Sequence, residues 1–144
     1  MKKFNGILTL IILSLFLILN GSINAQSSKK PLLIVSQNIV PMQDMGKLNK
    51  LGDSLFVPIL KELVDEGMIM SFGQFVHSWG DEWNVNYWYT AKDLASFEKF
   101  WKEYVKRVSS RHPGAFGKAV KYFTAHKDNI YTIRGQYPVP PQSK

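Results

Sequence analysis

The residues whose types could support chemistry gather in one stretch, QFVHSWGDEWNVNYWYT, residues 74–90. His77 offers an imidazole that can act as a general base or a metal ligand, or can simply be hydrogen-bonded within a strand. Asn86 can orient a polar ligand or pair across a sheet, and Trp88 can stack on a ligand or pack in an interface. Asn38, earlier in the chain, has the same two interpretations as Asn86. These four residues form the candidate ligand-binding site, and His77 is the candidate catalytic residue.

Composition and spacing exclude several other kinds of chemistry. The chain has no cysteine, which excludes thiol nucleophiles and Cys-ligated metals. Its three histidines lack a metal-binding spacing such as HExxH, and His112 and His126 are predicted to be surface residues. Asp81 and Glu82 are adjacent, so in a strand they point in opposite directions and make a poor acid/base pair. We therefore predict no metal site, and no cofactor.

The elements that must position these residues begin with a strand and a long helix. Residues 31–40, PLLIVSQNIV, are rich in β-branched residues and bounded by prolines, which is typical of a strand. Asp44 is a candidate N-cap for a helix that ends at Gly67. Pro58 lies inside this helix and cannot donate a backbone hydrogen bond, so we expect a kink or break near residues 54–56.

The remaining chain predicts a hairpin, a second helix and a last strand. The expected elements are strands over 68–79 and 82–90 joined by a turn at Gly80 and Asp81, a helix over 94–108 capped by Asp93, a short helix over 115–125, and a strand over 129–135. The buried face of the second helix is expected to contain Leu94, Phe97, Trp101, Tyr104, Val105 and Val108. The order β-α-β-β-α-(α)-β is that of a ferredoxin-like α+β domain over 31–135, with helices on one face of a four-stranded antiparallel sheet.

Alternation along the strands predicts which side chains share a face of the sheet. In the first strand we assign Leu33, Val35, Gln37 and Ile39 to the helix-covered face and Leu32, Ile34, Ser36, Asn38 and Val40 to the bare face. The second and third strands add Phe75, His77, Trp79, Asn86 and Trp88 to that bare face. Large apolar groups on an open face mark interfaces or ligand sites, so we expect a homodimer with a pocket between the two sheets.

The two ends of the chain are predicted to lie outside the domain. Residues 1–25 begin with two lysines and an apolar run too short for a comfortable membrane span, and Ala25 suits the end of a signal peptide. We expect export to the periplasm or beyond, with no stable membrane anchor after cleavage. Residues 26–30 are expected to be disordered, and residues 136–144 form a Pro-rich tail.

The charge of +7 is unevenly distributed along the chain. Residues 31–91 carry three Lys and seven acids, and residues 92–127 carry nine Lys or Arg and three acids. A basic segment can meet nucleic acid, or can be the solvated face of a helix. Lys99, Lys102 and Lys106 recur at helical spacing, which favours the solvated helix, and no nucleic-acid partner is predicted.

The element order, the strand NYWYTAKD leading into LASFEKFWKEYV, and the PMQDM turn before the long helix resemble the dimeric α+β barrel superfamily. That superfamily holds antibiotic-biosynthesis-type monooxygenases, heme-degrading monooxygenases and NIPSNAP-like proteins. The heme-degrading members use an asparagine on the first strand, a tryptophan on the third and a histidine on the second helix. Asn38 and Trp88 match by position, but residues 94–108 contain no histidine, which counts against heme.

Three functions remain open on this basis. The first is an exported dimeric protein that binds a small, partly polar or aromatic molecule, in the manner of a cofactor-independent oxygenase. The second is a non-catalytic exported protein whose aromatic sheet face is only a dimer or partner interface. Heme binding is the lesser alternative. The sequence does not decide whether the protein is an enzyme.

Overall fold

A computed structural model describes residues 30–77 and 82–135. The predicted signal peptide, most of the segment at 26–30, the turn at Gly80 and Asp81, the side chain of Trp79 and the Pro-rich tail lie outside the described residues. Within them, no helix has the length and apolar character needed to cross a membrane.

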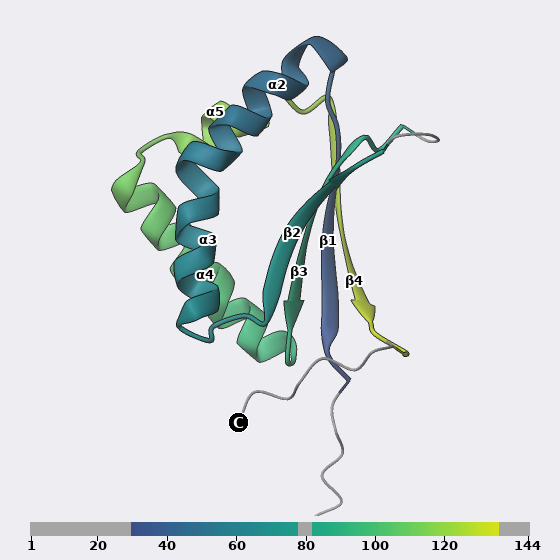
Figure 1. Cartoon of the computed structure of the whole chain (residues 1–144), viewed down its shortest axis with the longest axis vertical. Coiled ribbons are helices and arrows are strands. Elements are labelled where there is room, and N and C mark those ends of the chain that lie inside the picture. Colours follow the sequence, from purple (N-terminus) through teal and green to yellow (C-terminus); the bar gives the residue numbers. More distant parts are fainter. Residues whose placement is uncertain (1–29, 78–81, 136–144) are drawn as a thin grey trace, which may run out of the picture.

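The predicted element order is confirmed. In chain order the elements are β1 (Leu32–Ile39), α2 (Met42–Leu51), a π-helical segment η1 (Gly52–Phe56), α3 (Val57–Asp65), β2 (Ser71–Val76), β3 (Val85–Ala91), α4 (Leu94–Arg111), α5 (Ala115–Val120) and β4 (Ala125–Thr132). The strands form one antiparallel sheet in the order β2-β3-β1-β4, and the helices cover one face of it (Figure 1). This is the ferredoxin-like α+β arrangement.

The helix ends follow local rules, with one correction. The first helix begins at Met42 after Pro41, so Asp44 lies in the first turn and is not the N-cap. The predicted break is confirmed, because the π-helical turn Gly52–Phe56 separates α2 from α3 just before Pro58. Gly67, at φ 71°, ends α3 as predicted. Asp93 caps α4, since its Oδ1 accepts from the Ser96 backbone N–H at 2.9 Å.

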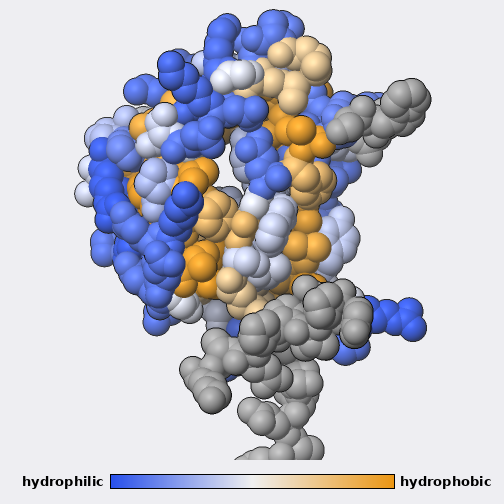
Figure 2. Space-filling model, in the orientation of Figure 1, coloured by the Kyte–Doolittle hydropathy of each residue, from blue (hydrophilic) through white to orange (hydrophobic). Residues whose placement is uncertain are grey.

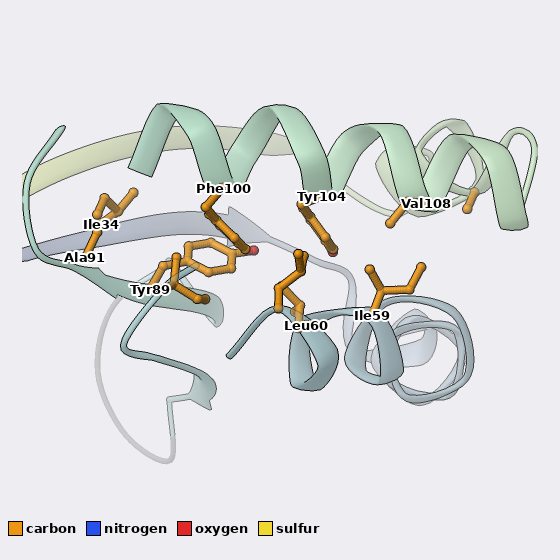
Figure 3. Close-up of a cluster of buried hydrophobic side chains, with 11 residues drawn as sticks. Ile34, Ile59, Leu60, Tyr89, Ala91, Phe100, Tyr104 and Val108 are labelled. Carbon is orange, nitrogen blue, oxygen red and sulfur yellow. The ribbon is translucent and has the colours of Figure 1, made fainter. Parts of the chain in front are cut away.

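The main core lies between α3, α4 and the sheet (Figure 3). Phe100 is fully buried there, and its ring stacks on Tyr104 with centroids 5.7 Å apart. From the sheet, Ile34 and Tyr89 complete the cluster. Leu94 and Trp101, which the sequence assigned to the buried face of α4, are instead 47% and 40% exposed.

The helices are also joined to each other by ion pairs. Arg107 of α4 binds Glu66 at the end of α3 through two bonds of 2.7 Å, and Arg111 binds Glu62 at 2.7 Å. These bonds hold the pKa of both carboxyl groups below the ordinary value. The lysines of the basic segment, Lys99, Lys102 and Lys106, are exposed on α4 as the solvated-helix interpretation expects.

The assignment of β1 to the two faces of the sheet was wrong by one residue. Ile34 pairs with Tyr89 and Ser36 with Tyr87, on the helix-covered face, whereas Val35 pairs with Trp88 on the other. The reason is that Leu32 to Val35 are all apolar, and Ile34 and Val35 are both buried although they point to opposite faces. Alternation within the strand therefore cannot decide on which face each side chain lies. The pairing of β1 with β3 decides it.

Candidate functional site

A cavity of about 720 Å³ lies between the helices and the sheet. Figure 2 shows this hollow, with hydrophobic side chains around its opening. The aromatic lining comes from both layers: Phe56, Phe72, Tyr87, Tyr89, Phe97, Trp101, Tyr104, Phe116 and Phe123. Sites for small organic molecules have volumes of roughly 300–1,000 Å³ and mostly apolar walls with a few polar groups. The cavity therefore has the size and character of a small-molecule site.

Part of the cavity wall comes from the π-helical segment η1. Gly52, Asp53 and Phe56 of η1 line the cavity, with Val57 at the start of α3. The shorter α5 contributes Phe116, and Phe56 lies against that ring at a centroid distance of 5.3 Å. The helical layer thus closes over part of the sheet through aromatic contacts and leaves space elsewhere.

The polar part of the lining centres on β4. His126 Nδ1 lies 2.8 Å from Asn38 Oδ1, and His126 Nε2 lies 3.1 Å from an oxygen of Asp128. The imidazole also stacks on Phe123, with the ring planes 11° apart. His126 and Asp128 both line the cavity, so their side chains are available to a ligand there.

The hydrogen bonds of Asn38 require a proton on Nδ1 of His126. Asn38 is fully buried, and its Nδ2 donates to the backbone oxygens of Val85 (3.2 Å) and Ser36 (3.3 Å). Reversing the amide would place Oδ1 against two carbonyl oxygens, so Oδ1 must be the atom that faces the histidine. His126 Nδ1 therefore carries a proton and donates it. Nε2 faces Asp128 and the cavity, and because a carboxylate only accepts, its 3.1 Å contact with Asp128 is a hydrogen bond only when Nε2 carries a proton as well.

Tyrosine hydroxyls add neutral donors to the wall. Burial, with a smaller contribution from the charge of Asp53, raises the pKa of Tyr87 to about 12. Burial raises the pKa of Tyr89 and of Tyr104 as well. All three hydroxyls are therefore protonated at neutral pH and can act as hydrogen-bond donors or acceptors.

The four residues predicted as the site do not come together. Asn38 lies on the helix-covered face, because it pairs with Val85 and bonds to His126. Asn86 and Trp88 lie on the opposite, bare face, where Asn86 pairs with Gln37. His77 follows β2 and pairs through its N–H with Asn84 O at 3.4 Å. None of His77, Asn86 and Trp88 lines the cavity.

The bare face has the mixed aromatic and polar character that was expected. The Trp88 indole lies directly over Gly73 of β2, where a Cβ would come within 2.6 Å of the ring. Glycine is therefore required for this packing. Lys127 lies 4.0 Å from the centre of the Trp83 ring. Among the described residues, His77 Nδ1 and Asn86 Oδ1 are buried without a hydrogen-bond partner.

Sequence reasoning missed His126 and Asp128 as site residues. The last strand was predicted over 129–135, but β4 runs from Ala125 to Thr132, so both residues lie within it. The signal that could have found them is the two-residue spacing of His126, Asp128 and Ile130, which places all three on one face of a strand. No group of three or more metal-ligating side chains occurs among residues 30–77 and 82–135.

Comparisons with known proteins identify the fold. No protein-family model matches the chain, and no curated protein matches its sequence. A dimeric ferredoxin-like protein from an uncultured marine organism is similar over 76% of this chain and 91% of its own, with 9% identity and a TM-score of 0.60. A NIPSNAP family protein from Agrobacterium tumefaciens is similar over 73% and 89%, with 9% identity and a TM-score of 0.59.

A NIPSNAP-like domain protein from Burkholderia xenovorans is similar over 81% of this chain and 97% of its own, with 10% identity and a TM-score of 0.57. Similarity at these identities is similarity of fold. The resemblance stated from the sequence is confirmed at that level: the chain has the ferredoxin-like α+β fold that solved NIPSNAP-family and dimeric ferredoxin-like proteins share.

Proposed function

We propose that the protein binds a small, largely apolar organic molecule in the cavity between its helices and its sheet. The observation that carries this proposal is the cavity itself, about 720 Å³ with nine aromatic side chains in its wall. An open hollow of this size leaves its apolar lining in contact with water, and a ligand would bury that surface. The Asn38–His126–Asp128 chain gives such a ligand one polar end.

Two neighbouring positions on β1 allow a matched test with N-phenylnaphthylamine, a neutral dye that fluoresces in apolar sites. Ser36 lines the cavity, whereas the next residue, Gln37, faces the opposite side of the sheet. We expect Ser36→Leu to fill part of the cavity and weaken dye binding roughly tenfold, by about 1.4 kcal/mol. Gln37→Leu should leave the affinity unchanged. Equal weakening by the two variants, or a wild-type protein that does not bind the dye, would contradict the proposal.

We propose in addition that the protein is a homodimer through its bare sheet face. Phe75 and Tyr131, on strands β2 and β4, are 47% and 48% exposed. Two of the structurally similar proteins are described as dimeric.

A single charge on the bare face should separate the two copies. Phe75→Glu places an unpaired carboxylate in an apolar interface, so we expect a monomer by size-exclusion chromatography with light scattering. The control is Met42→Glu, because Met42 is 73% exposed on the helical layer and its replacement should leave the dimer intact. A wild-type monomer, or a Phe75→Glu protein that stays dimeric, would refute this interface.

A further inference from the structure

The charged residues that line the cavity have the opposite sign to the chain as a whole. The chain has 18 Lys and Arg against 11 Asp and Glu, a formal net charge of +7. The carboxylates in the lining are Asp53 and Asp128. No Lys or Arg belongs to it among the described residues, and its basic side chain, His126, is bonded to Asp128. A cavity built to receive a carboxylate or phosphate would need basic groups or exposed backbone N–H groups there.

The two carboxylates lie on opposite walls. Asp53 belongs to η1 in the helical layer, and Asp128 belongs to β4 in the sheet. Within the part of the chain that the structure describes, Asp53 has no ion-pair partner and the ion-pair partner of Asp128 is His126. The charge of Asp53 acts on Tyr87, and that of Asp128 acts on Tyr89, so both fields reach the aromatic wall.

The aromatic rings favour the same sign of ligand charge. The face of an aromatic ring carries partial negative charge, which attracts ammonium groups and disfavours anions. The ring faces that a cation can contact in this lining act in the same direction as the two carboxylates. Desolvation of a cation on entering the cavity is offset by both kinds of contact, whereas an anion would gain neither.

On the basis of the proposed binding function, we infer that the cavity takes an organic cation, a protonated amine or a quaternary ammonium group on an apolar body. The ammonium group would lie against the aromatic wall within the field of Asp53 and Asp128, and the apolar body would fill the rest of the space.

The test uses three compounds of nearly equal shape, measured by calorimetry at neutral pH: para-tert-butylbenzylamine, para-tert-butylbenzyl alcohol and para-tert-butylbenzoate. We expect the amine, which is protonated, to bind roughly tenfold more tightly than the alcohol, and the benzoate to bind weakest. Asp53→Asn and Asp128→Asn should each weaken amine binding by roughly three- to tenfold, which is more than they weaken binding of the alcohol. Asp65→Asn is the matched control, because Asp65 is exposed on α3 outside the cavity lining.

The outcomes separate this inference from the proposed function. Benzoate or alcohol binding as tightly as the amine overturns the inference and leaves the cavity as a binding site. Amine binding that falls equally in Asp65→Asn and in the two cavity variants also overturns it, since the effect then reflects overall charge. If none of the three compounds binds while the neutral dye does, the inference fails alone. If the dye does not bind either, both the inference and the proposed binding function are wrong.

Discussion

Replacing Phe100 with alanine is expected to lower the free energy of unfolding by about 3–5 kcal/mol. The ring is fully buried at the centre of the main core and lies within 6 Å of three other rings, with centroid distances of 5.6 Å to Tyr89, 5.7 Å to Tyr104 and 5.9 Å to Phe97. Removing it takes away apolar burial and leaves a space bounded by rigid elements on both sides. The measurement is urea unfolding followed by circular dichroism, with the slope compared between variants.

Leu94→Ala provides the control on the same helix. Leu94 begins α4 and is 47% exposed, so its truncation should cost less than about 1 kcal/mol. A Phe100→Ala protein that unfolds at nearly the same urea concentration as Leu94→Ala would show that this part of the core can collapse around the missing ring. That result would also argue that the neighbouring cavity is not held open by rigid walls.

Phe100 illustrates what the periodicity of α4 could and could not predict. The helix, its cap at Asp93 and an aromatic stripe were all predicted, because apolar residues at three- and four-residue spacing define one face. The stripe was centred on Trp101, whereas the structure centres it on Phe100 and leaves Trp101 40% exposed at the cavity. A helix with aromatics at adjacent positions has two candidate faces, and only the packing against β3 and α3 chooses between them.

The fold was predictable because its signals are local. Gly67 ends a helix, Pro58 interrupts one, and the hairpin around residues 71–91 has its two apolar runs close in sequence. The site depends on contacts between distant parts of the chain. Asn38 and His126 are 88 residues apart, and they meet because β4 pairs with β1 at that register.

Two errors therefore removed the site from the sequence-based prediction. The four apolar residues from Leu32 to Val35 left the faces of β1 undecided, and Asn38 was assigned to the bare face. The segment from Ala125 to Asp128 lacks β-branched residues, so its strand character was not visible, although the pairing with β1 imposes it. The mixed aromatic face of the hairpin, by contrast, was local enough to be predicted.

Asn84 offers the second large effect, because it holds the end of β1 through its side chain. Asn84 Oδ1 accepts from the Val40 backbone N–H at 2.9 Å, and Asn84 Nδ2 donates to the Val40 carbonyl oxygen at 2.7 Å. Val40 is 1% exposed and Asn84 is 7% exposed, so water does not replace these bonds. The amide thus extends the pairing of β1 with β3 beyond the last backbone pair, at Asn38 and Val85.

Asn84→Ala is expected to destabilise the protein by about 2–4 kcal/mol, because it leaves both a buried N–H and a buried C=O of Val40 unpaired. Asn49→Ala is the matched control, since among the described residues the Asn49 side chain bonds that of exposed Gln74, at 3.0 Å, and its loss should cost under about 1 kcal/mol. Equal midpoints of urea unfolding for the two variants would mean that the chain relaxes to pair Val40 elsewhere.

Because Val40 follows Asn38 by two residues, the same substitution should also loosen the amide that orients His126. We therefore expect Asn84→Ala, assayed below its unfolding transition, to bind N-phenylnaphthylamine more weakly than Asn49→Ala does.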